Sequence, residues 1–145
     1  MNIIDLELYK WKLYQEGIFK RSKVPITGQV DWWLNNGMFI STLPRQSGKT
    51  ELLIRMSKIL QQEKENFIFI VPNQITKHDI LNRTKYYPND IRVCGTLDVV
   101  NYFKNIQANF THLLIDEYCS FYNFIMKELL TINWKSVSAV GSLQL

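Results

Sequence analysis

The residues of this sequence best suited to chemistry are a lysine and a threonine that directly follow a glycine, at positions 48 to 50. The Lys49 ammonium can reach the β- and γ-phosphates of a nucleotide, and the Thr50 hydroxyl is placed to coordinate Mg²⁺. Gly48 lets the backbone approach a phosphate without a Cβ in the way. Backbone N–H groups of the loop and of the first helical turn then bind the phosphate, helped by the helix dipole.

The loop around this triplet has the composition of a phosphate-binding P-loop, the Walker A motif. An apolar run at 38–40 precedes it, and a helix-forming segment begins at Glu51. The standard pattern starts with a glycine, whereas this sequence has Leu43 there, so the match is less specific when taken alone. The loop residues expected to bind ATP are Pro44, Arg45, Gln46, Ser47, Gly48, Lys49 and Thr50.

Two adjacent carboxylates, Asp116 and Glu117, follow a short apolar run at 113–115. Such a run predicts a buried strand, and the carboxylates then emerge at the carboxyl edge of the sheet, where α/β proteins bind ligands. In a P-loop ATPase the first acid holds Mg²⁺ and the second deprotonates the attacking water. We therefore expect Thr50 and Asp116 to be metal ligands, and Glu117 and Lys49 to be catalytic.

An apolar run followed by Asp-Glu is common among proteins, so its specificity comes from its pairing with Gly-Lys-Thr upstream. The pair together predicts a Walker B motif opposite a Walker A motif. His112, at the start of the same strand, is expected to be a structural or exposed histidine rather than a base.

Apolar patterns around the two motifs alternate between strand and helix signals. Strands are predicted at 38–40, 66–71, 91–94, 110–117 and 137–141. Helices are predicted at 3–17, ending near Gly17, and at 29–35, 51–63, 76–84 and 121–130, with another opening at 95–96. This alternation predicts an α/β fold, a three-layer domain with a mostly parallel central sheet flanked by helices. We expect one domain over 1–145, with an N-terminal helix and basic loop at 1–24 and a nucleotide-binding core at 25–145.

Composition limits the class of protein. The 145 residues are 46% hydrophobic and 21% charged, which is ordinary for a globular domain. No apolar run approaches the roughly 20 residues of a membrane span, and the acidic start does not resemble a signal peptide, so we expect a cytoplasmic protein without a membrane partner. Cys94 and Cys119 lack metal-ligand spacing and are expected to be reduced core thiols. A net charge of +4 permits a polyanionic partner without requiring one.

The P-loop with its Arg45-Gln46 pair, together with Asp116-Glu117, resembles the ATPase domain of phage terminase large subunits. It also looks like the first motor domain of superfamily one and two helicases. The resemblance covers about residues 25–145 and implies a RecA-like fold, Mg²⁺-dependent ATP hydrolysis and action on DNA in a larger viral assembly. If the terminase likeness holds, Arg45 reaches the γ-phosphate as a sensor or charge stabiliser; otherwise its guanidinium lies in solvent over the loop.

Four weaker matches depend on position alone. Gln29 lies where many nucleic-acid motors read the adenine edge with an amide, although a surface glutamine needs no such role. Asn73 and Thr96 follow strands where the resemblance implies contact with the nucleic-acid backbone. Gln144 follows the last strand, where helicases sense the γ-phosphate.

The sequence stops at Leu145, directly after the predicted sensor strand. We therefore expect a partner protein or self-association to complete the ATP cleft and to supply an arginine finger. A catalytically weak P-loop scaffold that binds a host or viral protein is the alternative. A small-molecule kinase is a third hypothesis, disfavoured because no arginine follows Arg92.

Overall fold

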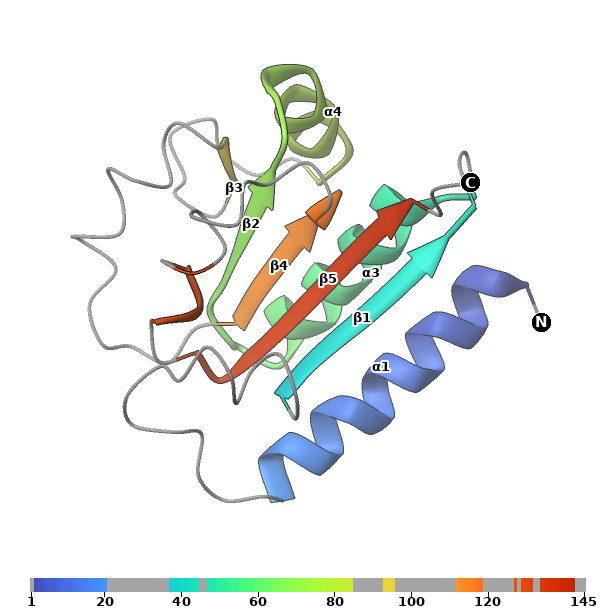
Figure 1. Cartoon of the computed structure of the whole chain (residues 1–145), viewed down its shortest axis with the longest axis vertical. Coiled ribbons are helices and arrows are strands. Elements are labelled where there is room, and N and C mark those ends of the chain that lie inside the picture. Colours follow the sequence, from blue (N-terminus) through green and yellow to red (C-terminus); the bar gives the residue numbers. More distant parts are fainter. Residues whose placement is uncertain are drawn as a thin grey trace.

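The computed structural model of this chain is an α/β fold built on a parallel sheet (Figure 1). It describes residues 2–20, 37–44, 47–84, 93–95, 112–118, 127, 129–131 and 134–142. The helices in this part of the chain are α1 (Ile3–Lys20), α3 (Lys49–Gln62) and α4 (Gln74–Thr84). The strands are β1 (Met38–Leu43), β2 (Phe67–Val71), β3 (Val93–Gly95), β4 (His112–Asp116) and β5 (Ser136–Ser142).

The five strands lie in the order β1-β5-β4-β2-β3, and every neighbouring pair is parallel. The predicted α/β fold with a parallel sheet is thus confirmed. Strands β2, β4 and most of β5 are buried along their whole length, as expected for parallel strands covered on both faces. The order brings β5 between β1 and β4, so the P-loop strand and the acidic strand are each hydrogen-bonded to β5.

One face of the sheet packs against α1 and α3 around a continuous apolar cluster. Phe69, Leu114 and Val140 project from this face of the sheet, and Leu52, Met56 and Leu60 come from α3. Alternate residues such as Ile70, Leu113 and Ala139 point to the opposite face and are buried as well. The core therefore holds the carboxyl ends of β4 and β5 and the amino end of α3 in fixed positions.

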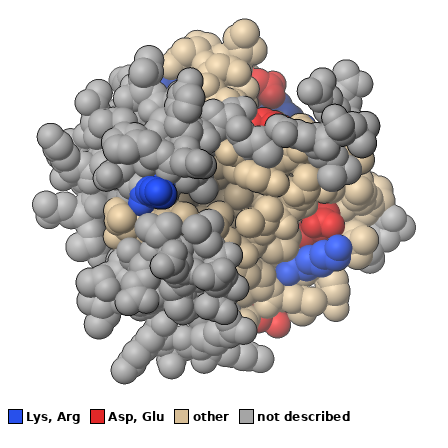
Figure 2. All heavy atoms as spheres, viewed as in Figure 1, with Lys and Arg blue, Asp and Glu red and all other residues tan. Residues whose placement is uncertain are grey.

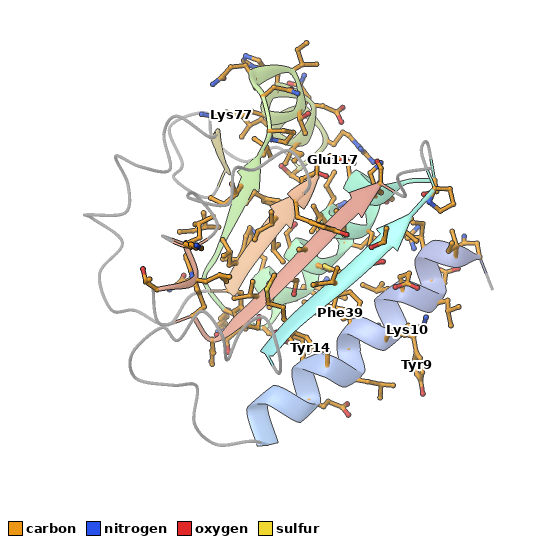
Figure 3. All side chains as sticks on the ribbon, in the orientation of Figure 1. Tyr9, Lys10, Tyr14, Phe39, Lys77 and Glu117 are labelled. Carbon is orange, nitrogen blue, oxygen red and sulfur yellow. The ribbon has the colours of Figure 1, made fainter. Side chains whose placement is uncertain are left out.

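Helix α1 runs beside β1, with its first turn next to the carboxyl ends of the strands (Figure 1). Asn2 caps it, because the Asn2 side-chain oxygen accepts from the N–H of Asp5 at 2.8 Å. Tyr14 of α1 packs its ring against Phe39 of β1, with 5.7 Å between the ring centroids (Figure 3). The helix continues to Lys20 instead of ending near Gly17, since an internal glycine costs only about 1 kcal/mol.

Charged side chains tie the helices to one another. Arg55 of α3 donates to Asp5 of α1 at 2.9 Å and to Glu51 at 3.2 Å, and Arg83 of α4 also pairs with Glu51. Figure 2 shows charged side chains of both signs next to each other over α1, where Lys10 and Glu7 form an ion pair at 3.1 Å. None of the described helices is long and apolar enough to cross a membrane.

Several predicted elements agree closely with the structure. Helix α3 and strands β2, β4 and β5 lie within two or three residues of their predicted bounds. Helix α4 begins at Gln74, two residues earlier than expected, because Asn73 caps it. Residues 127, 129 and 130 are helical, within the helix predicted at 121–130. The helices predicted at 29–35 and at 95–96 onward lie outside the described residues, apart from Gly95, which ends β3.

Candidate functional site

The loop after β1 is shaped by a buried leucine and a left-handed glycine. Leu43, the last residue of β1, is 2% exposed and belongs to the apolar cluster, so it anchors the strand in the core. The Ser47 hydroxyl donates to the Pro44 carbonyl, which closes the loop. Gly48 has φ of 91° and ψ of 33°, a left-handed conformation that glycine adopts without strain. The chain then enters α3 at Lys49, where the Gly48 carbonyl accepts from the Leu52 N–H at 3.0 Å.

Two side chains from different motifs meet at the amino end of α3. The Thr50 hydroxyl donates to Asp116 Oδ2 at 3.1 Å. Asp116 is only 1% exposed, and its other oxygen, Oδ1, is buried with no hydrogen-bond partner in the structure. Burial raises the pKa of Asp116 to about 6, helped by the nearby charge of Glu117 and opposed by the Thr50 hydrogen bond and by Lys49. A buried carboxylate with an unsatisfied oxygen beside a hydroxyl is suited to bind a hard cation.

The second pair joins the P-loop lysine to the second acid. Lys49 Nζ lies 2.9 Å from Glu117 Oε1, and the two side chains are 14% and 26% exposed. Glu117 Oε1 also accepts from the Ser142 hydroxyl at 2.8 Å. Glu117 stands at the carboxyl end of β4 (Figure 3), with φ of 53°, which non-glycine residues seldom adopt. A strained backbone at this position is typical of a functional site, because the surroundings must hold it there.

Sequence reasoning missed Ser142 and Tyr118. Ser142 ends β5 and pairs in register with Leu43, so it lies between the P-loop and the acids. The Tyr118 hydroxyl is 3.0 Å from the Thr42 hydroxyl on β1. Its ring crosses β5 at Gly141, where a Cβ would lie 2.4 Å from a ring carbon. The available signal was position, since both residues adjoin the carboxyl end of a predicted strand.

The donor set fits Mg²⁺ with a nucleotide triphosphate. Mg²⁺ takes oxygen ligands, keeps several waters and is usually held by one or two carboxylates plus substrate phosphates. Thr50 and the unsatisfied oxygen of Asp116 supply such ligands. Within the described ranges, no group of three or more His, Cys, Asp or Glu side chains converges as a metal site.

The other predicted residues are placed as follows. Asn73 is exposed at the end of β2, and its side-chain oxygen accepts from the N–H of Thr76 at 2.8 Å, so it caps α4. His112 is fully buried and its Nδ1 lies 2.5 Å from the Ser136 hydroxyl, in agreement with a structural role. Five predicted residues lie outside the described part of the chain: Arg45, Gln46, Gln29, Thr96 and Gln144.

No protein-family model matches the chain, and no curated protein matches it either.

Proposed function

We propose that this protein is a Mg²⁺-dependent ATPase domain of the helicase or terminase type, with a three-layer RecA-like fold. The observation that carries the proposal is the convergence of Lys49 and Thr50 with Asp116 and Glu117 in two direct contacts, at 2.9 and 3.1 Å. Lys49 and Glu117 are 68 positions apart in the sequence, and Thr50 and Asp116 are 66 positions apart. A lysine, a hydroxyl and two carboxylates, four of the groups that phosphoryl transfer to water uses, are therefore present at one sheet edge, and we expect the arginine finger to come from a partner.

Each residue has a distinct role in this proposal. Lys49 binds the β- and γ-phosphates, and the backbone N–H groups at the start of α3 bind the β-phosphate. Thr50 and Asp116 hold Mg²⁺, which neutralises the charge on the phosphates when it is bound. Phosphate binding draws Lys49 away from Glu117, and a Glu117 oxygen becomes available to accept the proton of an attacking water.

The proposed action on DNA and place in a viral assembly depend on the resemblance to terminase and helicase motor domains. We infer that the domain acts on DNA within a larger viral assembly, and that a partner protein or a second copy completes the cleft. The exposed position of Asn73 beyond β2, at the same sheet edge as the P-loop, supports a nucleic-acid contact there. Arg45 as a γ-phosphate sensor, Gln29 at the adenine, Gln144 as a second sensor and Thr96 on the nucleic-acid backbone belong to the same proposal.

The experiment is ATP turnover by the purified chain with Mg²⁺, measured alone and with single-stranded or double-stranded DNA. We expect DNA to stimulate hydrolysis, Lys49→Ala to abolish ATP binding, and Glu117→Gln to bind ATP with turnover reduced about 100-fold or more. Lys135→Ala is a matched control, because Lys135 also pairs with a glutamate, Glu65 at 2.7 Å, but from the opposite end of the sheet. It should keep full activity.

The outcomes separate the ATPase from the alternative. ATP binding that survives Lys49→Ala, or hydrolysis that Glu117→Gln leaves intact, would contradict the assigned roles. Hydrolysis that no DNA or RNA changes would contradict the helicase or terminase type. Failure of the wild-type chain to bind ATP in calorimetry, with a protein partner co-purifying, would instead support a P-loop scaffold.

A further inference from the structure

Ile4, in the first turn of α1, borders the space that a side chain at Gly48 would occupy. A Cβ placed on Gly48 would lie 3.3 Å from Ile4 Cδ1 and 3.4 Å from Ile4 Cγ1. The Ile4 side chain is 8% exposed and belongs to the main apolar cluster. Ile4 therefore packs close beside Gly48, whose backbone is left-handed.

Helix α1 is in turn fixed to the sheet by buried hydrogen bonds far from the loop. Trp11 Nε1 donates to the Ser138 hydroxyl at 2.9 Å, and Gln15 Nε2 donates to the Ser136 hydroxyl at 3.1 Å. The Tyr14 hydroxyl donates to the Val137 carbonyl at 3.0 Å. All three partners are on β5, so the helix has a defined position relative to the strand that also carries Ser142.

Near the loop, α1 is held by two polar contacts from the turn that follows Ile4. Asp5 pairs with Arg55 of α3 at 2.9 Å, and Glu7 accepts from the Ser41 hydroxyl of β1 at 2.8 Å. The first of these contacts is to the helix that follows the P-loop and the second is to the strand that precedes it. The start of α1, which carries Ile4, is thus tied to both elements that border the P-loop.

We propose that Ile4 is a positioning residue that holds residues 47–50 of the P-loop in a phosphate-binding conformation, so that docking of α1 sets nucleotide affinity. This inference rests on the proposed function for its ligand. A loop that keeps Gly48 left-handed presents the N–H groups of Lys49 and Thr50 at the start of α3 toward an anion. If the ordered loop is only a fraction of the population, apparent affinity falls by that fraction.

The test compares two truncations on the same face of α1. Ile4→Ala removes the contact with Gly48, whereas Leu8→Ala removes methyl groups one turn further on, where Leu8 packs against the same apolar cluster. The first readout is hydrogen exchange of the amides of residues 47–50 in the full chain without nucleotide. The second is calorimetric affinity for MgADP, which binds without turnover, with folding of both variants checked by circular dichroism.

We expect Ile4→Ala to accelerate exchange in the P-loop and to weaken MgADP binding about tenfold, with Leu8→Ala close to the wild type in both. Ile4→Leu, which keeps a branched side chain against Gly48, should restore both readouts. Equal effects of Ile4→Ala and Leu8→Ala would overturn the inference and leave the proposed function intact. If the wild-type chain bound no nucleotide, the proposed function would fail, and the exchange data would still decide whether Ile4 orders the loop.

Discussion

Gly141 is a residue at which the candidate site depends on the lack of a side chain. An added Cβ would lie 2.4 Å from the ring of Tyr118, closer than real Cβ contacts come. Tyr118 follows Glu117 and reaches Thr42 with its hydroxyl, so moving its ring also moves the backbone that carries the candidate base. We expect Gly141→Ala to reduce ATP turnover about tenfold or more and to destabilise the fold by about 1–3 kcal/mol through overpacking.

Steady-state turnover and urea denaturation measure these two effects. The double variant Gly141→Ala/Tyr118→Ala is the control, since the truncated residue 118 leaves space for the new methyl group. Its stability should exceed the sum expected from the single variants. A Gly141→Ala variant with unchanged turnover would show that the ring adapts without disturbing Glu117.

At the residue scale, the sequence predicted a site that includes Lys49, Thr50, Asp116 and Glu117, but it did not predict the direct contacts between them. Gly48, Lys49 and Thr50 were recognisable because a loop of this composition has a specific chemical use. Ser142 was not, because its contact with Glu117 depends on β5 lying between β1 and β4. Strand order results from long-range packing, which local patterns do not encode.

At the scale of an element, β4 carries His112 at its amino end and Asp116 at its carboxyl end, and these two groups change the stability of the fold with pH in opposite directions. Burial raises the pKa of Asp116 to about 6 and lowers the pKa of His112 to about 4, with the Lys135 charge adding to the second shift and Glu65 opposing it. As pH rises from about 4 to about 6, the folded state retains a proton on Asp116 that the unfolded chain loses, so stability falls. His112 acts in reverse: the unfolded chain is protonated below pH 6.5 while the folded state is not, so stability falls as pH drops toward 4.

Because the pH dependences from Asp116 and His112 have opposite signs, we expect the stability of the wild type to owe little net pH dependence to β4 between about pH 4 and 6. Asp116→Asn should raise the free energy of unfolding at neutral pH by up to roughly 3 kcal/mol and expose a steep loss on acidification. His112→Gln should show the opposite trend, with stability declining as pH rises. Urea midpoints collected across this range, without Mg²⁺, measure both. Profiles that stay parallel to the wild type would contradict the pKa assignments.

The elements themselves were the most predictable part of the molecule. Apolar runs predicted β2 and β4, and 3.6-residue spacing predicted α3, because burial on one or both faces leaves a direct signature in sequence. The residues at which helices end were less predictable. Helix α1 passes Gly17, where a Cβ would meet no atom within 4 Å, so the glycine is not required there for packing or for a turn.

At the scale of the whole molecule, α1 is part of the core. From the sequence, residues 1–24 are predicted to form an N-terminal helix and basic loop that precede a nucleotide-binding core. In the structure, Ile4 and Trp11 belong to the same apolar cluster as Leu52 of α3 and Leu114 of β4. The helix, the P-loop and the acidic strand therefore share one core, and loss of α1 would expose the face of the sheet that supports the site.

The contribution of α1 to the whole fold can be measured with two aromatic residues on opposite sides of the helix. Trp11 is 1% exposed and hydrogen-bonded to Ser138, whereas Tyr9 is 56% exposed. We expect Trp11→Ala to lower the free energy of unfolding by about 3–5 kcal/mol, through the cavity and the unpaired Ser138 hydroxyl, and Tyr9→Ala to change it by less than about 0.5 kcal/mol. Urea denaturation followed by far-ultraviolet circular dichroism measures both. If α1 were a separate appendage, the two substitutions would cost the same, and the sheet would unfold at the wild-type midpoint in each. A single cooperative transition that shifts only for Trp11→Ala would show that α1 unfolds together with the sheet that carries the candidate site.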